Sequence, residues 1–197
     1  MTPRRAGPSD RAAVVATLER AFVRDPVLRW LFPEEASYPA RAAAFFGGLF
    51  DLRVEGGEVW ILEGAAALWE PPGGNRLPLT VRERLWEAAT AAVFETEATA
   101  RLERHEALIA RLLPANRGWY LGVLGVDPSL QGRGLGRAVL RPVLEVADRN
   151  RLPARLETAT ATNLPFYRGV GFEVSAEDRH AEGPHVWAMT RRPSPRP

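Results

Sequence analysis

Residues 119–141 read WYLGVLGVDPSLQGRGLGRAVLR, the most informative stretch of the chain. The apolar run Trp119–Val126 stops at Asp127-Pro128, which predicts a strand. The glycine-rich loop Gln131–Gly136 follows, and a helix is expected from there to about Arg149. A strand, a glycine loop and a helix in succession predict an anion site. The first N–H groups of the helix lack acceptors, and the helix dipole adds partial positive charge.

The spacing of the glycines, together with the lack of lysine, excludes two common kinds of phosphate ligand, dinucleotides and nucleoside triphosphates. A dinucleotide loop needs G-x-G-x-x-G directly after its strand, but the last glycine position falls here on Arg137 or Val139. Five residues also separate the strand from Gly132. A nucleoside-triphosphate loop requires a lysine, and the sequence has none. Gly132, Gly134 and Gly136 with two flanking arginines therefore favour another phosphate-bearing ligand.

The pattern V-D-P followed by Q-x-x-G-x-G resembles the acetyl-CoA loop of the GCN5-related N-acetyltransferase (GNAT) superfamily. A second segment, Asn163–Tyr167 (NLPFY) followed by Gly171-Phe172, resembles another cofactor motif of that superfamily. Further segments resemble the puromycin N-acetyltransferase group within it: RL at 101–102, LET, EGP and W-x-MTR. The resemblance implies an α/β (α+β) domain whose mixed, mostly antiparallel sheet has splayed central strands and is flanked by helices.

The resemblance also implies the roles of the cofactor-binding residues. Backbone groups of Leu124, Gly125 and Val126 would pair with pantetheine, and Asn163 would contact the same arm. The pyrophosphate would be held by Gln131, Gly132, Arg133, Gly134, Leu135, Gly136 and Arg137. Acetyl-CoA is the expected cosubstrate, and no metal is expected.

Direct acetyl transfer to an amine needs a neutral amine, a donor to the oxyanion and a proton for the leaving thiolate. The Val126 N–H can donate a hydrogen bond to the oxyanion. The Tyr167 hydroxyl can donate a proton to the sulfur, unless Tyr167 is only a packing aromatic. The strand Trp119–Val126 carries no carboxylate that could act as the base. Glu157 on the next strand is the candidate, with a structural salt bridge as the equal alternative. His105 lies on an apolar helix face, which favours a core histidine over a base.

The acceptor pocket is expected from the variable parts of the chain, because aromatic side chains with a carboxylate suit an amine that carries a flat ring. The candidates are Asp25, Trp30, Phe32, Trp69, Trp119 and Tyr120, with His105 beside them. The expected acceptor is a small-molecule primary amine, such as an aminonucleoside or an antibiotic-like compound. A protein or peptide amine, or a CoA-binding protein without turnover, are the alternatives. An enclosed aromatic pocket favours the small molecule, whereas an open acidic groove favours a peptide.

Composition supports one globular domain over residues 1–191, with a disordered tail over 192–197. The chain has 197 residues, 46% apolar and 25% charged, with no cysteine and three histidines, a poor basis for a metal site. The formal charge is only +2, and arginine alternates with glutamate, so nucleic acid is not expected as a partner. No apolar stretch could span a membrane. We expect a cytoplasmic monomer or homodimer.

The remaining elements follow from hydrophobic periodicity and turn signals. A helix is expected from Ser9 or Asp10 to about Arg24, and a loop over Asp25–Pro33. Thr80-x-x-Glu83 predicts a capping box. The other expected elements are helices over 38–53, 99–113 (closed by Pro114) and 163–170, a hairpin of 58–63 with 65–70, a strand over 154–160, and closing strands at 171–172 and 185–191.

Overall fold

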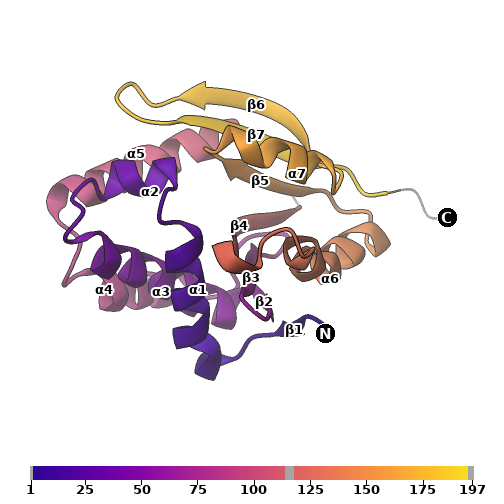
Figure 1. The fold of residues 1–197 in the computed structure, drawn as a ribbon, viewed down its shortest axis with the longest axis horizontal. Coiled ribbons are helices and arrows are strands. Elements are labelled where there is room, and N and C mark those ends of the chain that lie inside the picture. Colours follow the sequence, from indigo (N-terminus) through magenta and orange to yellow (C-terminus); the bar gives the residue numbers. More distant parts are fainter. Residues whose placement is uncertain (1, 114–117, 195–197) are drawn as a thin grey trace.

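The computed structural model describes residues 2–113 and 118–194 and contains one mixed sheet between two groups of helices (Figure 1). The strand order is β1-β2-β3-β4-β5-β7-β6. Among these pairs, only β4 with β5 is parallel. The strands are β1 Arg4–Arg5, β2 Glu58–Leu62, β3 Ala65–Glu70, β4 Trp119–Val126, β5 Ala154–Thr158, β6 Glu173–Arg179 and β7 His185–Arg191. The predicted fold class is confirmed.

Two hydrophobic cores lie on opposite faces of the sheet, because successive side chains of a strand point to opposite sides. In β3, Ala66 and Leu68 belong to the core beneath α1 and α3, whereas Ala67 and Trp69 belong to the core beneath α6. The helices are α1 Arg11–Ala21, α2 Pro26–Leu31, α3 Tyr38–Gly56, α4 Leu79–Thr90, α5 Thr96–Leu112, α6 Leu135–Arg149 and α7 Leu164–Arg168.

Three local expectations were wrong. The predicted loop over Asp25–Pro33 contains α2, because the Asp25 carboxylate accepts the N–H groups of Val27 and Leu28 and so caps the helix. The capping box at Thr80 is not formed, because α4 begins at Leu79 and its first turn has no side-chain cap. The closing strand expected at residues 171–172 is not there, because Gly171 forms a turn with φ +92° and the strand β6 begins only at Glu173. In addition, the two-residue strand β1, which pairs with β2, was not predicted.

The C-terminal strand β7 is fastened to α6 by a bidentate ion pair. Both terminal nitrogens of Arg191 lie 2.7 Å from the Asp148 carboxylate, which also accepts the Ser194 N–H at 2.8 Å. Ser194 is thus held, although it falls in the tail expected to be disordered; residues 195–197 of that tail and Pro114 lie outside the described residues. Over the described ranges, no helix is both long and apolar enough to cross a membrane.

Candidate active site

The central strands β4 and β5 separate after a short stretch of pairing. Their pairs join Trp119–Leu121 to Ala154–Leu156, although β4 continues to Val126. Opposite Leu68 and Trp69 of β3, β4 carries a bulge that shifts the pairing register of the two strands. A bulge bends the strand that carries it. The second half of β4 therefore turns one backbone edge toward a gap, as the family resemblance implied.

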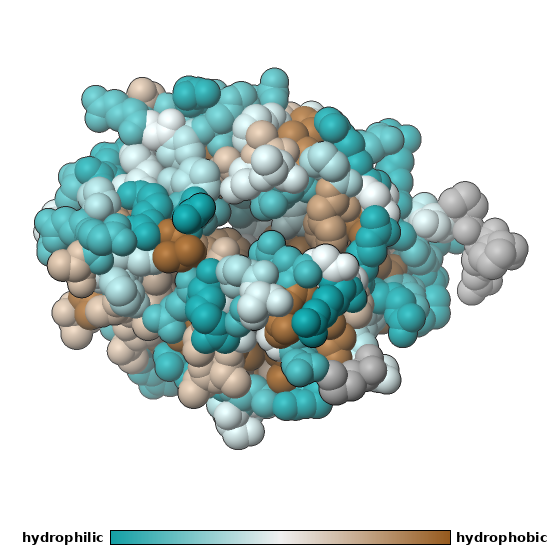
Figure 2. All heavy atoms as spheres, in the orientation of Figure 1, coloured by the Kyte–Doolittle hydropathy of each residue, from teal (hydrophilic) through white to brown (hydrophobic). Residues whose placement is uncertain are grey.

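A pocket of about 560 Å³ opens at this gap. Its walls come from the end of α1, the second half of β4, the glycine loop and α7. Figure 2, in the orientation of Figure 1, shows a hollow near the middle of this face. Most of the predicted site residues line the pocket: Asp25, Leu124, Gly125, Val126, Gln131, Gly132, Gly134, Leu135, Gly136, Arg137, Asn163 and Tyr167. Arg133 is exposed on the same loop.

The glycines of the loop have two different roles. Gly132 and Gly134 have φ values of +79° and +78°, which residues with side chains rarely adopt. In the described part of the chain, no atom lies within 4 Å of a Cβ built on either glycine. At Gly136 a Cβ would lie 3.2 Å from Phe166 Cζ, so this glycine lets α6 approach α7. Because α6 starts at Leu135 without a side-chain cap, its first N–H groups can bind an anion in the pocket.

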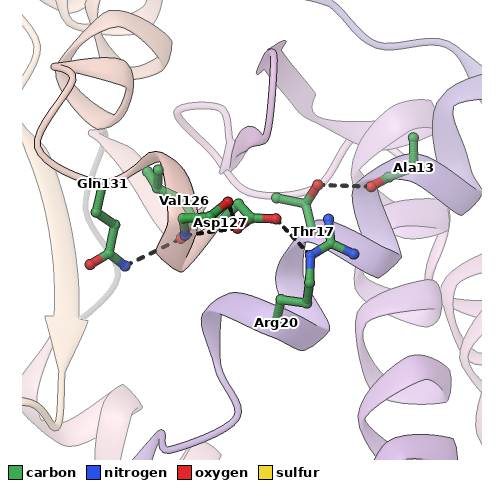
Figure 3. Close-up of polar contacts among 7 residues, drawn as sticks. Ala13, Thr17, Arg20, Val126, Asp127 and Gln131 are labelled. Atoms are coloured by element: carbon green, nitrogen blue, oxygen red, sulfur yellow. Dashed lines mark hydrogen bonds and ion pairs between the residues drawn. The ribbon is translucent and has the colours of Figure 1, made fainter.

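The loop is fastened at its base to α1 (Figure 3). Asp127 accepts the Ser129 N–H and hydroxyl on one oxygen and the Arg20 Nε, at 2.6 Å, on the other. These hydrogen bonds, those from Ser129 first, lower the pKa of Asp127 to about 2. Gln131 Nε2 donates to the Val126 carbonyl at 3.3 Å, which brings the loop against the free edge of β4.

Behind the gap, on the sheet face away from α6, lies a group of four side chains: Arg53, Glu70, Tyr120 and Glu157. We call it the polar cluster. The Tyr120 hydroxyl donates to Glu157 Oε1 at 2.8 Å, while Glu157 Oε2 is buried and has no hydrogen-bond partner among the described residues. Burial raises the pKa of Glu157 to about 7, against the opposing effects of the Tyr120 hydrogen bond and of Arg53. A carboxyl group that titrates near neutrality can accept a proton there.

Arg53 and Glu70 were missed by the sequence reading. Arg53 Nη2 lies 3.1 Å from Glu70 Oε1, and only 7% of the arginine side chain is exposed. Burial also raises the pKa of Tyr120 well above its usual value, as does the neighbouring Glu157. No local pattern marks Arg53, because it lies on α3 more than sixty residues before Tyr120.

Tyr167 of α7 and Asp25, the N-cap residue of α2, both line the pocket. The Tyr167 side chain is 7% exposed and packs against Phe166 and Phe172. Burial raises the pKa of Tyr167, and the charges of Glu157 and Asp25 raise it further. Burial also raises the pKa of Asp25, although its two backbone hydrogen bonds oppose this. Tyr167 therefore lies close enough to Glu157 and Asp25 for their negative charges to affect its pKa.

The other predicted acceptor residues are not brought together with Tyr120. Trp69 and Trp119 are buried in the core beneath α6 and contact each other edge to face at 6.4 Å. Phe32 is fully buried in the opposite core, among Phe45 and Phe94. These three indole and phenyl rings are packing residues in this structure.

His105 and Trp30 form a separate contact between α5, α2 and the β6–β7 hairpin. His105 Nδ1 lies 3.1 Å from His180 Nε2, and the Trp30 ring stacks on His180. Burial lowers the pKa of His105 to about 4, with His180 adding to the effect. His105 is half-buried, is paired with His180, and is not among the residues that line the pocket. Among the described residues, no group of three or more His, Cys, Asp or Glu side chains could hold a metal ion.

Comparison with known proteins finds similarity to acetyltransferases. Residues 81–172 match the model of the "Acetyltransferase (GNAT) family". The chain is 25% identical over 193 residues to an uncharacterized N-acetyltransferase of Schizosaccharomyces pombe, covering 87% of this chain and 74% of the relative. It is 42% identical over 50 residues to the N-alpha-acetyltransferase RimI of Mycobacterium tuberculosis, which covers 25% of this chain and 32% of that protein.

Among solved structures, the fold is similar to that of "histone acetyltransferase HPA2 and related acetyltransferase" from Corynebacterium glutamicum. The TM-score is 0.72 at 22% identity, and the alignment covers 99% of this chain and 97% of the other. The family match and the N-acetyltransferase relatives support an acyltransferase enzyme of the GNAT type, and acetyl-CoA is the cosubstrate of that family.

Proposed function

We propose that this GNAT-type acetyltransferase transfers the acetyl group of acetyl-CoA directly to the primary amine of a small molecule. One observation carries the proposal: beside the gap between β4 and β5, the Tyr120–Glu157 pair lies on the sheet face away from α6, whereas Tyr167 packs in the core on the α6 face. A base and an acid on either side of one opening suit a reaction in which an amine loses a proton while a thiolate gains one.

The loop residues fit a phosphate-bearing cosubstrate. Gly132 and Gly134 leave open space where side chains would stand, and the start of α6 supplies N–H groups to an anion. The free edge of β4 at Leu124–Val126 can accept an extended arm as an added strand. Arg137 is partly engaged, because its Nη1 donates to the Gly169 carbonyl at 2.8 Å. Arg137 would then bind the phosphate of the ligand and also hold the loop after α7.

The proposed chemistry uses three groups of this chain. Glu157 takes a proton from the amine nitrogen as that nitrogen bonds to the thioester carbonyl carbon. The Val126 N–H stabilises the oxyanion. As the carbon–sulfur bond breaks, the Tyr167 hydroxyl supplies a proton to sulfur, and the products are the amide and free CoA. No protein nucleophile is needed, which suits a chain without cysteine.

Enclosure of the polar cluster supports a small acceptor. Helix α5 is tied to the β6–β7 hairpin by the His105–His180 contact and by an ion pair between Arg111 and Asp178. The hairpin lies beside β5, the strand that carries Glu157, because β7 pairs with both β5 and β6. The resemblance to puromycin N-acetyltransferases supports an antibiotic-like amine. A peptide amine is the second candidate, favoured by the 50-residue similarity to RimI.

The test is release of free CoA from acetyl-CoA in the presence of two matched sets of acceptors. One set contains small primary amines with aromatic rings, including aminonucleosides, and the other contains short peptides with free N-termini. The proposal expects kcat/KM for the best small amine to exceed that for the best peptide at least about tenfold, which corresponds to a difference of about 1.4 kcal/mol. A preference for peptides would reject the small-molecule acceptor, and no CoA release with either set would reject transfer to amines of these classes.

A charge placed at Gly134 should weaken acetyl-CoA binding. In the parent protein, acetyl-CoA at about 100 times its Kd should stabilise the fold by about 2.7 kcal/mol, or roughly 5–10 °C in Tm. In Gly134→Asp we expect most of this shift to disappear, because a carboxylate would stand beside the pyrophosphate. Thermal melts with and without acetyl-CoA measure the effect.

Gly134→Asn is the matched control, since Asn and Asp are of equal size and both tolerate a positive φ. It should keep more of the acetyl-CoA shift than Gly134→Asp. Equal shifts in the two variants would mean that no phosphate charge lies near this position.

A further inference from the structure

The buried arginine of the polar cluster is held in place from two sides. Arg53 lies in the last turns of α3, and its guanidinium pairs with Glu70 on β3 at 3.1 Å. On the other side it lies against β4 at Gly122, where a Cβ would be only 2.8 Å from Arg53 Nη2. Gly122 falls in the bulge at which β4 changes register. The lack of a side chain at the bulge therefore lets the guanidinium rest directly on the strand that carries Tyr120.

The charges that face Glu157 make Arg53 important. The Tyr120 hydroxyl, the Glu70 carboxyl and the Tyr167 hydroxyl are all neutral or negative groups, and they come from β4, β3 and α7. Arg155, on the same strand as Glu157, donates from Nη1 to the Leu113 carbonyl. From the helices above, Glu106 of α5 interacts with Arg82 of α4 and with Arg53 itself. Among the described groups that shift the pKa of Glu157, Arg53 is the cation, and its charge lowers that pKa.

We propose that Arg53, fixed between Glu70 and the β4 bulge, is a positioning residue that keeps the Glu157 carboxylate ionised and able to accept the proton of the acceptor amine. The inference rests on the proposed function in naming Glu157 as the base. The same charge also acts on the Tyr120 hydroxyl, which donates to Glu157. Arg53 thus acts on the reaction through the pair Tyr120–Glu157 and touches no reacting atom.

The test is a pH titration of the Glu157 carboxyl carbon by NMR in protein labelled with ¹³C at the glutamate side chains. The Glu157 resonance is assigned by its loss in Glu157→Gln. The parent protein should titrate with a pKa of about 7. In Arg53→Met the midpoint should rise by about 1 pH unit, because an opposite charge near a carboxyl lowers its pKa by this order. In Arg53→Lys, which keeps the charge, the midpoint should lie close to that of the parent protein.

A matched control lies on the same helix. Arg41 is also buried and pairs with Glu95 at the start of α5, toward the other end of α3. Arg41→Met should leave the Glu157 midpoint in place. A folded Arg53→Met protein with an unmoved midpoint, or an equal rise in Arg41→Met, would overturn the inference.

Gly122→Ala supplies a second route if Arg53→Met does not fold. The added methyl group keeps every charge but pushes the guanidinium away from β4, so the midpoint should rise in the same direction. An unmoved midpoint in folded Gly122→Ala would then count against Arg53.

The proposed function can fail separately from this inference, because the titration involves no acetyl transfer. If Arg53 acts through Glu157, the acid limb of the kcat profile should move with the NMR midpoint, about tenfold lower at pH 6 in Arg53→Met and little changed at pH 9. If the NMR midpoint moves and the kcat limb does not, Glu157 is not the base, although Arg53 still sets its ionisation.

Discussion

Glu157→Gln is expected to lower kcat by about 10³-fold with the best amine acceptor, within the range for loss of a general base. The amide has nearly the shape of the carboxyl group but cannot take the proton. Because burial raises the pKa of Glu157 to about 7, activity of the parent protein should rise with pH through neutrality. This limb should be absent from the kcat profile of Glu157→Gln. Steady-state rates between pH 5.5 and 9 measure both effects.

The same variant should be more stable than the parent protein at alkaline pH. The folded-state pKa of Glu157 is higher than the ordinary value of 4.5, so the folded protein binds the proton more tightly than the unfolded chain. Stability of the parent protein therefore falls as pH rises from about 4.5 to 7, by an amount on the order of 3 kcal/mol. The glutamine side chain of the variant has no charge to bury, so Tm at pH 8 should rise.

Glu173→Gln is the control, since Glu173 is an exposed residue at the start of β6. It should change neither kcat nor Tm appreciably. If Glu157→Gln kept its activity and lost stability, Glu157 would be a structural partner of Tyr120 rather than a base.

Tyr167→Phe is expected to lower kcat by about 10²-fold, with an acetyl-CoA Kd within about twofold of the parent value. The variant loses one hydroxyl and keeps the ring contacts with Phe166 and Phe172. Burial raises the pKa of Tyr167, which weakens it as an acid. The thiolate that leaves into the same pocket is desolvated too, and its own affinity for a proton rises for the same reason. Single-turnover rates and calorimetric binding separate the two quantities.

The loss of kcat in Tyr167→Phe should be smaller with an acyl donor that has a better leaving group, because a thiolate that is a weaker base needs less help from a proton. Tyr38→Phe is the matched control. The Tyr38 hydroxyl donates to the Phe22 carbonyl at 2.7 Å, so this variant should lose stability and keep the rate of the chemical step. Equal single-turnover rates for Tyr167→Phe and the parent protein would assign the proton on sulfur to water or another donor.

The strand, loop and helix of residues 119–149 were predictable because their determinants are local. An apolar run, two glycines at positive φ and an amphipathic helix each leave a periodic or compositional trace in the sequence. The same holds for the hairpin of β2 and β3. Helix α2 was missed because its cap depends on the Asp25 carboxylate turning back onto two N–H groups. That conformation competes with other turn conformations of the same residues.

The residues of the acceptor pocket were harder to predict, because side chains of the same type lie on opposite faces of the sheet. Trp69 and Tyr120 are both aromatic residues of neighbouring strands, yet Trp69 faces the core beneath α6 while Tyr120 faces Glu157. The bulge in β4 decides this, since one extra residue changes which side chains share a face. A bulge in the middle of an apolar strand has no reliable signal in a single sequence.

The sequence by itself predicted the fold class, the glycine-rich loop that we propose to bind phosphate, and the candidates Tyr167 and Glu157. These predictions depend on short segments and on the family resemblance that those segments carry. Only the tertiary structure decided what surrounds Glu157. Burial sets its pKa, Tyr120 comes from the neighbouring strand, and Arg53 comes from a helix about a hundred residues earlier. Electrostatic interactions depend on distance in space and on exclusion of water, and neither quantity is written in the order of the residues along the chain.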